Sequence, residues 1–117
     1  MVSNAYIPEP GHVIKIDLDP GVGHEQRGWR PALVLSPKLY NGKTGMAVVV
    51  PITSQVKGYT FEVSLSKQMR ISGVVLADAI KSVDWRARNA KCVDTATAEV
   101  VKAVQDRLVA LLGLPLS

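Results

Sequence analysis

The sequence has few of the residues that usually build disulfides and metal centres. Its 117 residues include one cysteine, Cys92, and two histidines. A lone cysteine cannot form an intrachain disulfide, and a chain of this length can bury one core without such a crosslink. Cys92 has no neighbouring cysteine or histidine, so we expect it to pack as a small apolar side chain. We expect no metal site, no cofactor and a reducing, cytoplasmic location.

Long apolar runs are absent as well. No stretch approaches the ~20 apolar residues of a membrane span, and residues 1–10 lack the pattern of a secretory signal. We expect a single domain over residues 1–117, with residues 1–10 as a loose N-terminal arm and no membrane partner. Lysine and arginine exceed aspartate and glutamate by 14 to 10, a net charge of +4, which permits a polyanionic partner.

Most of the chain has the pattern of short strands. Between Val13 and Val83, β-branched apolar segments are interrupted by glycine and proline, which predicts strands rather than helices. The predicted strands cover residues 12–18, 32–35, 46–50, 60–65, 73–76 and 80–83. In one of them Phe61 and Val63 should point inward and Glu62 outward. So many short strands favour a small curled barrel over a parallel sheet.

The end of the chain has a helical pattern instead. Val101, Val104, Leu108 and Leu111 recur at helical spacing, and Gly113 provides a stop signal. This predicts a helix over about residues 96–113 that covers one open face of the barrel. The predicted fold class is therefore mainly β with a C-terminal α-helix.

Three segments carry more chemistry than a scaffold needs: residues 19–29, 53–59 and 78–88. Basic and aromatic side chains alternate in these segments and directly beside them, which suits single-stranded nucleic acid because bases stack while cations hold phosphates. The cations are Arg27, Arg30, Lys57, Lys81, Arg86 and Arg88, and the aromatic residues are Trp29, Tyr59, Phe61 and Trp85. Composition does not separate binding from cleavage. The pair Gly21 and Gly23 lacks the third glycine and the helix of a dinucleotide fingerprint, and we expect His12 to be a surface residue.

Longer motifs follow one another in a specific order. They are GHEQRGWRP (23–31), LVLSP (33–37), YNGKTGM (40–46), VPITS (50–54), KGYTFEV (57–63) and GVVLADAIKSVDWRAR (73–88). From about Gly11 to Gly113 the sequence resembles the MazF/PemK toxin family. Within that family it is more similar to the MazF branch than to the Kid or ChpB branches.

The resemblance implies both a fold and an activity. The fold is a small SH3-like barrel of the CcdB/PemK type that assembles as a homodimer. The activity is that of a type II toxin: a metal-independent, sequence-specific endoribonuclease that cleaves single-stranded RNA, chiefly mRNA, and so inhibits translation and growth. The 2′-OH attacks the adjacent phosphate and leaves 2′,3′-cyclic phosphate and 5′-OH ends. A MazE-like antitoxin would lay an acidic C-terminal segment across the toxin dimer and its RNA groove.

The resemblance also assigns roles to individual residues. Arg30 matches the family's catalytic arginine, Thr53 its catalytic hydroxyl, and Glu25 a position tied to activity. In the Kid branch an arginine acts as the acid where this chain has Leu76, whereas that branch's aspartate and histidine are present as the possible helpers Asp78 and His24. The residues that we expect to contact RNA are Arg27, Trp29, Ser54, Gln55, Lys57, Tyr59, Phe61, Lys81 and Arg86.

Two other functions fit a small basic barrel. One is a CcdB-type toxin that poisons gyrase and cuts no RNA, and the other is an RNA-binding barrel without catalysis. The step from Arg30 to Pro31 and the strand end at Thr53 argue against the gyrase poison, because such a protein needs no phosphate-cleaving groups.

Overall fold

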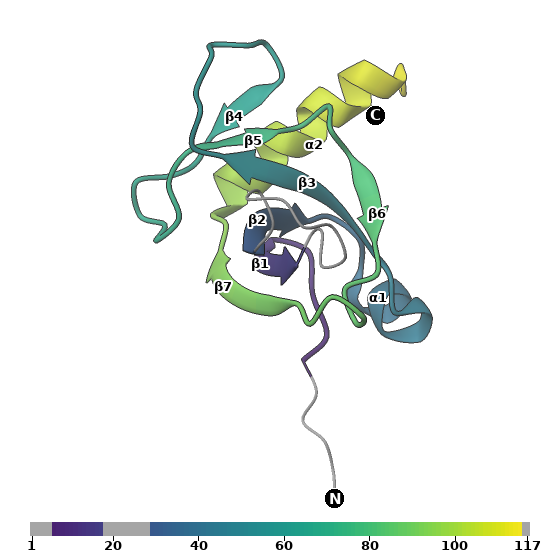
Figure 1. Cartoon of the computed structure of the whole chain (residues 1–117). Helices are drawn as coiled ribbons and strands as arrows, with labels where there is room; N and C mark the ends of the chain where they lie inside the picture. Colours follow the sequence, from purple (N-terminus) through teal and green to yellow (C-terminus); the bar gives the residue numbers. More distant parts are fainter. Residues whose placement is uncertain (1–5, 18–28, 116–117) are drawn as a thin grey trace, which may run out of the picture.

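The structure is a computed structural model that describes residues 6–17 and 29–115 (Figure 1). Its elements in chain order are β1 (His12–Asp17), β2 (Trp29–Val34), α1 (Lys38–Thr44), β3 (Ala47–Thr53), β4 (Glu62–Ser64), β5 (Val74–Leu76), β6 (Lys81–Val83), β7 (Lys91–Thr95) and α2 (Ala98–Leu112). The predicted class, mainly β with a C-terminal helix, is confirmed. No helix in these two stretches is long and apolar enough to cross a membrane.

The strands form one antiparallel sheet in the order β4-β5-β3-β2-β1-β7. Strand β6 lies outside this order and pairs with the first residues of β3, whereas β5 pairs with the last residues of β3. The sheet curls around its own face (Figure 1), as expected for a barrel. It is not closed, however: among the described residues no pairing joins β7 to β4. The curled wall therefore has two edges, and β3 is its longest strand.

One face of the sheet packs against α2. Cross-strand neighbours share a face, so the register places Val13, Leu33 and Val50 in one buried row. The apolar side of α2, with Val104 and Leu108, packs on this row. The helix begins at Thr97, whose hydroxyl accepts a hydrogen bond from the Val100 N–H, and ends at Gly113 in the left-handed conformation. The helix predicted over about 96–113 is thus observed over Ala98–Leu112.

The opposite face has its own core. Ile14, Ile16 and Val34 are buried there with Trp85, which is only 6% exposed. The prediction that Trp85 stacks on RNA bases is therefore wrong: its ring fills the core, and its indole N–H donates to the carbonyl of Asn41 at 3.1 Å. This core occupies one end of the face, beside the first residues of β3.

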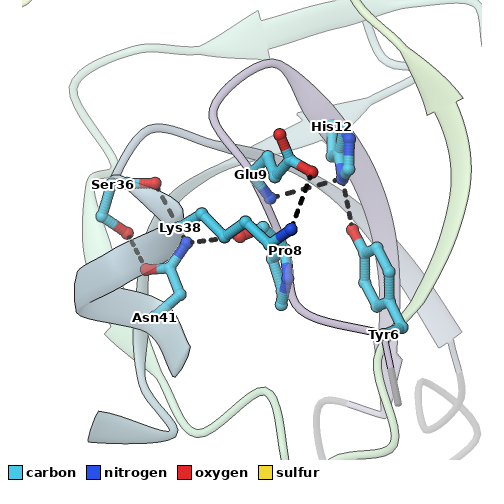
Figure 2. A network of polar contacts seen from close by, with 7 residues as sticks. All are labelled: Tyr6, Pro8, Glu9, His12, Ser36, Lys38 and Asn41. Carbon is cyan, nitrogen blue, oxygen red and sulfur yellow. Dashed lines mark hydrogen bonds and ion pairs between the residues drawn. The ribbon is translucent and has the colours of Figure 1, made fainter. Parts of the chain in front are cut away.

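Residues 6–10 close the same end (Figure 2), so the prediction of a loose arm is wrong for them; residues 1–5 lie outside the described part. The ring of Tyr6 stacks on His12 with 5.6 Å between centroids, and its hydroxyl lies 2.6 Å from His12 Nδ1. The carbonyl of the buried Pro8 accepts from Asn41 Nδ2 at 2.9 Å. His12 is half-buried by these contacts rather than a surface residue.

The buried side chain at the centre of this end is Asn41, in α1. Its amide oxygen accepts from Ser36 Oγ at 2.6 Å, and its amide nitrogen also donates to the Ser36 carbonyl at 3.0 Å (Figure 2). Every polar atom of the amide thus has a partner although Asn41 is fully buried. Neither α1 nor β7 was predicted, because α1 is short and contains Gly42, and β7 is a mostly polar strand whose Cys92 is exposed rather than packed.

Candidate active site

The sheet register brings Arg30 and Thr53 together. Ala32 pairs with Pro51, and continuing this antiparallel register by two residues sets Arg30 opposite Thr53. Side chains at directly opposite positions share a face and lie about 5 Å apart at Cβ. Both residues line one pocket of about 460 Å³, together with Pro31, Ile52, Ser54, Gln55 and Ser72. Arg30 is exposed and Thr53 is half-buried.

A proline marks the end of the pairing between β2 and β3. The N–H of Leu35 donates to Val48 on β3, so by alternation the donor position at residue 31 also faces β3. Pro31 has no N–H, and the ladder between β2 and β3 ends at Ala32. Arg30 and Thr53 lie beyond this last pair, and both line the first pocket.

The chain that crosses Thr53 on its other side leaves no room for a side chain. Gly73 has φ +122°, and a Cβ built there would lie 2.3 Å from the carbonyl oxygen of Thr53. Only glycine permits so close an approach in this backbone conformation. The Thr53 hydroxyl accepts a hydrogen bond from the N–H of Gln55 at 3.1 Å, so the hydroxyl keeps its own hydrogen for donation. The backbone of Thr53 therefore packs against Gly73, and its hydroxyl is bound by the N–H of Gln55.

A second pocket of about 420 Å³ adjoins the first and shares Thr53 and Gln55 with it. Its other lining residues are Lys57, Tyr59, Glu62, Leu76 and Asp78. The two pockets together form one concave surface along the end of β3 and the loop that follows it. Most of the predicted RNA-contacting residues in this loop lie here: Ser54, Gln55, Lys57 and Tyr59.

Asp78 reaches the second pocket because β5 ends in a turn. The N–H of Ala79 donates to the Leu76 carbonyl, which makes residues 76–79 a four-residue turn with Asp78 at its third position. Asp78 Oδ2 accepts from the Tyr59 hydroxyl at 2.8 Å. This hydrogen bond, with the negative charge of Asp78, raises the pKa of Tyr59 above its usual value. One oxygen of Asp78 remains for a substrate group.

Other predicted site residues lie elsewhere. His24, Glu25 and Arg27 fall outside the described residues, and Trp29 is placed only as the first residue of β2. Phe61 is half-buried against the core beneath α2, with its ring 6.2 Å from that of Tyr59.

Two predicted cations lie along β3 from Thr53. Lys81 pairs with Val49, four residues away from Thr53. Arg86 is further still: its guanidinium lies 4.9 Å from the centre of the Trp85 ring and donates to the Gly42 carbonyl at 2.9 Å. At about 3.3 Å per strand residue, the two ends of β3 are roughly 20 Å apart. These contacts favour a structural role for Arg86, at the end of the sheet that Trp85 closes.

Chemically, the site combines a guanidinium, a hydroxyl and a carboxylate around an open concavity. A guanidinium binds two phosphate oxygens at once, and a hydroxyl adds a third hydrogen bond. In residues 6–17 and 29–115 no group of three histidine, cysteine or carboxylate side chains could hold a metal ion. The sequence analysis did not predict Glu62 as a lining residue of the second pocket. The available signal was its predicted outward direction on the strand over residues 60–65, which follows Lys57 closely in the chain.

Comparison with known proteins identifies the family. The family model described as "PemK-like, MazF-like toxin of type II toxin-antitoxin system" matches residues 9–112. The chain belongs to this toxin family. The prediction from the sequence motifs is confirmed, and the match covers every strand and helix described above.

Relatives of the PemK/MazF family agree with this assignment. The endoribonuclease toxin MazF of Escherichia coli K12 is 50% identical over 113 residues, which cover 97% of this chain and all of the relative. The endoribonuclease PemK of Escherichia coli is 36% identical over 108 residues, 89% of this chain and 81% of PemK. The expectation of an endoribonuclease toxin is thus confirmed at the level of the family and its curated relatives.

Solved structures of the PemK/MazF family also match the fold. A MazE–MazF crystal structure from Deinococcus radiodurans (Form II) has a chain with a TM-score of 0.90 and 49% identity, covering 95% of this chain and all of that one. A MazF structure from the same organism gives a TM-score of 0.84 and 49% identity, covering 94% and 100%. The open curled sheet is therefore the fold of this toxin family.

Proposed function

We propose that this toxin cleaves single-stranded RNA, chiefly mRNA, at the Arg30–Thr53 pocket without a metal ion. The observation that supports the proposal most strongly is the convergence of these two side chains from neighbouring strands on one pocket. The sequence alone placed them in two separate segments, and nothing in a binding module or a gyrase poison calls for their meeting. The 50% identity to an endoribonuclease supports the same activity.

In the proposed reaction the ribose 2′-OH attacks the adjacent phosphorus. The new O–P bond closes a 2′,3′-cyclic phosphate, the bond to the 5′ oxygen breaks, and one proton leaves the 2′-OH while another is delivered to the 5′ oxygen. Negative charge builds on the two non-bridging phosphoryl oxygens. Arg30 binds these oxygens with its forked N–H groups, and the Thr53 hydroxyl donates a further hydrogen bond.

The two proton transfers need groups other than Arg30, because guanidinium groups stay charged at neutral pH. Asp78, in the adjoining pocket, has one carboxylate oxygen not used by Tyr59 and is the described candidate for the base. Glu25 and His24, also predicted for this work, lie outside the described residues. The RNA strand then runs from the Arg30 pocket along Gln55, Lys57 and Tyr59, where the cation meets phosphate and the ring can stack on a base.

The partners of the toxin follow from the same surface. We propose that it acts in the cytoplasm as a homodimer and is inhibited by a MazE-like antitoxin whose acidic C-terminal segment covers the RNA groove. The net charge of +4 favours both polyanions, and related toxins from Deinococcus radiodurans have been solved as MazE–MazF complexes. Because phosphate contacts release counterions, RNA affinity should fall steeply with salt.

The experiment that tests this function is cleavage of a long single-stranded RNA in the presence of EDTA, with both end groups mapped. We expect cuts at a short recurring sequence, with 2′,3′-cyclic phosphate on one fragment and 5′-OH on the other. Intact RNA after long incubation at high enzyme concentration would overturn the proposal and leave a gyrase poison or a non-catalytic barrel. Cleavage that stops with EDTA and returns with Mg²⁺ would overturn the metal-independent mechanism.

A further inference from the structure

The second pocket contains a carboxylate where an RNA-binding surface should disfavour one. Glu62 lines this pocket together with Lys57 and Tyr59. An exposed carboxylate there would repel the phosphates of a strand that passes the pocket. Its position therefore calls for a reason other than contact with RNA.

The hydrogen bonds of Glu62 supply that reason. Its Oε2 accepts from the N–H of Lys57 at 3.0 Å, and its Oε1 accepts from the N–H of Gly58 at 3.0 Å. Two consecutive backbone donors thus converge on one carboxylate and occupy both of its oxygens. Hydrogen bonds to a charged acceptor are about twice as strong as those between neutral groups.

Only part of the loop depends on this contact. The N–H of Glu62 donates to the Tyr59 carbonyl at 3.0 Å, and Arg107 of α2 donates to the Thr60 carbonyl at 3.2 Å, so the loop is held from residue 59 onward. Before residue 59, Gly58 takes the left-handed conformation with φ +76°. The Glu62 carboxylate binds the backbone of Lys57 and Gly58 to the start of β4.

We propose that Glu62 is a positioning residue of this toxin: by binding the backbone of Lys57 and Gly58 it fixes the RNA-contacting loop against the second pocket. Glu62 itself does not contact RNA. The loop side chains Lys57 and Tyr59 then meet the strand without first losing the conformational entropy of a mobile loop. The inference rests on the proposed function, because it concerns the binding of the RNA that the first pocket cleaves.

The test is steady-state cleavage of a short RNA that contains the sequence mapped with long RNA. Glu62→Gln keeps the shape of the side chain but turns one acceptor into an N–H donor that faces a backbone N–H. We expect KM to rise about tenfold, the loss of one charged hydrogen bond, with kcat within about threefold of the wild type. Glu99→Gln, an exposed glutamate in the first turn of α2, is the matched control and should change neither constant.

A second arm tests whether Glu62 acts through the loop. In a Lys57→Ala/Tyr59→Ala background the loop has lost the side chains that Glu62 positions, so E62Q should raise KM no further. The same tenfold rise in that background would overturn the inference, because Glu62 would then act on RNA directly. An unchanged KM for folded E62Q in the wild-type background would overturn it too.

The design separates this inference from the proposed function. If the wild type cleaves no RNA, the proposed function fails; if it cleaves and E62Q matches it, only the positioning role fails. Should E62Q not fold, Gly58→Ala strains the same turn, because an alanine rarely adopts the φ of +76° found there. Nothing lies within 4 Å of the added Cβ, so the variant introduces no clash. G58A should also raise KM and leave kcat in place, and an unchanged KM there would overturn the inference.

Discussion

The two ends of one sheet face differ in how they are finished. At the end near Ala47, Trp85 and residues 6–10 cover the core, and Asn41 satisfies its hydrogen bonds inside the protein. At the end near Thr53 the same face opens into two pockets. At the closed end the polar groups bind one another, whereas at the open end Arg30, Thr53 and Asp78 line the pockets.

The groups that hold each end also differ. The buried centre of the closed end is neutral, with the amide of Asn41 and the hydroxyl of Ser36 as its main links. The open end is held by carboxylates that accept backbone N–H groups: Glu62 from Lys57 and Gly58, and Asp94 from Ile71 at 2.8 Å. The comparison teaches that loops around a site for a polyanion can be fixed by acidic residues whose carboxylates accept backbone N–H groups.

The largest effect should follow a change at the crossing of Gly73 over Thr53. Gly73→Ala adds a Cβ 2.3 Å from the Thr53 carbonyl oxygen, at a φ that favours glycine. We expect a loss of about 4 kcal/mol in the free energy of unfolding, from strain and overpacking together. A displaced Thr53 should also lower kcat for RNA cleavage by about 100-fold.

Gly113→Ala is the matched control for that variant. Gly113 also has a positive φ, +69°, but nothing lies within 4 Å of its added Cβ. The G113A variant should lose about 1 kcal/mol in the free energy of unfolding, as expected for an L-residue in this conformation, and keep its cleavage activity. Equal effects of the two variants in urea unfolding and in cleavage would show that the close approach at Thr53 has no special role.

The next effect should separate stability from activity at the closed end. Asn41→Ala leaves the carbonyls of Pro8 and Ser36 buried without their donor, which should lower the free energy of unfolding by about 3 kcal/mol. Below its melting temperature the variant should cleave RNA within about threefold of the wild type. Gln105→Ala, an exposed amide on α2, is the control. A cleavage defect in folded N41A would break the division between the two ends.

The smallest effect concerns pH. Burial alone would raise the pKa of Asp94, but the N–H groups of Ile71, Thr95 and Arg70, with the charge of Arg70, lower it overall. A lowered pKa stabilises the fold above the ordinary aspartate pKa near ~4 and loses this contribution as the pH falls through the folded value. Asp94→Asn should therefore lower Tm at pH 7, and this difference should shrink as the pH falls below ~4. If the Tm difference between D94N and the wild type stays constant from pH 7 to ~3, the role of the carboxylate is contradicted. The Tm difference between N41A and the wild type should stay constant over this range, because the amide of Asn41 carries no charge.

Much of this architecture follows from local patterns. The strands around Val13, Leu33 and Val50 and the helix with Val104 were predicted because apolar periodicity is a local signal. Phe61 and Val63 point inward as predicted. The motifs around Arg30 and Thr53 identified the family before any geometry was known.

What the sequence did not show depends on contacts between distant residues. The hydrogen bond between Asn41 and Pro8 spans 33 residues, and no local pattern marks either as buried. Trp85 and Arg86 have the composition of a nucleic-acid surface, yet the fold uses the tryptophan as core. The loose-arm prediction failed for the same reason, since prolines mark residues 8 and 10 as irregular but not as unpacked.

The central claim is that RNA chemistry resides at the Thr53 end of the face, and two arginines test it side by side. Single-turnover cleavage and Tm should be measured for Arg30→Ala and Arg86→Ala. We expect R30A to lose about 1000-fold in rate with Tm nearly unchanged, as when a transition-state donor is removed. R86A should lose about 1 kcal/mol of stability with its cation–π contact and cleave within about threefold of the wild type. An R30A protein that cleaves at the wild-type rate, or a folded R86A that does not cleave, would contradict the account.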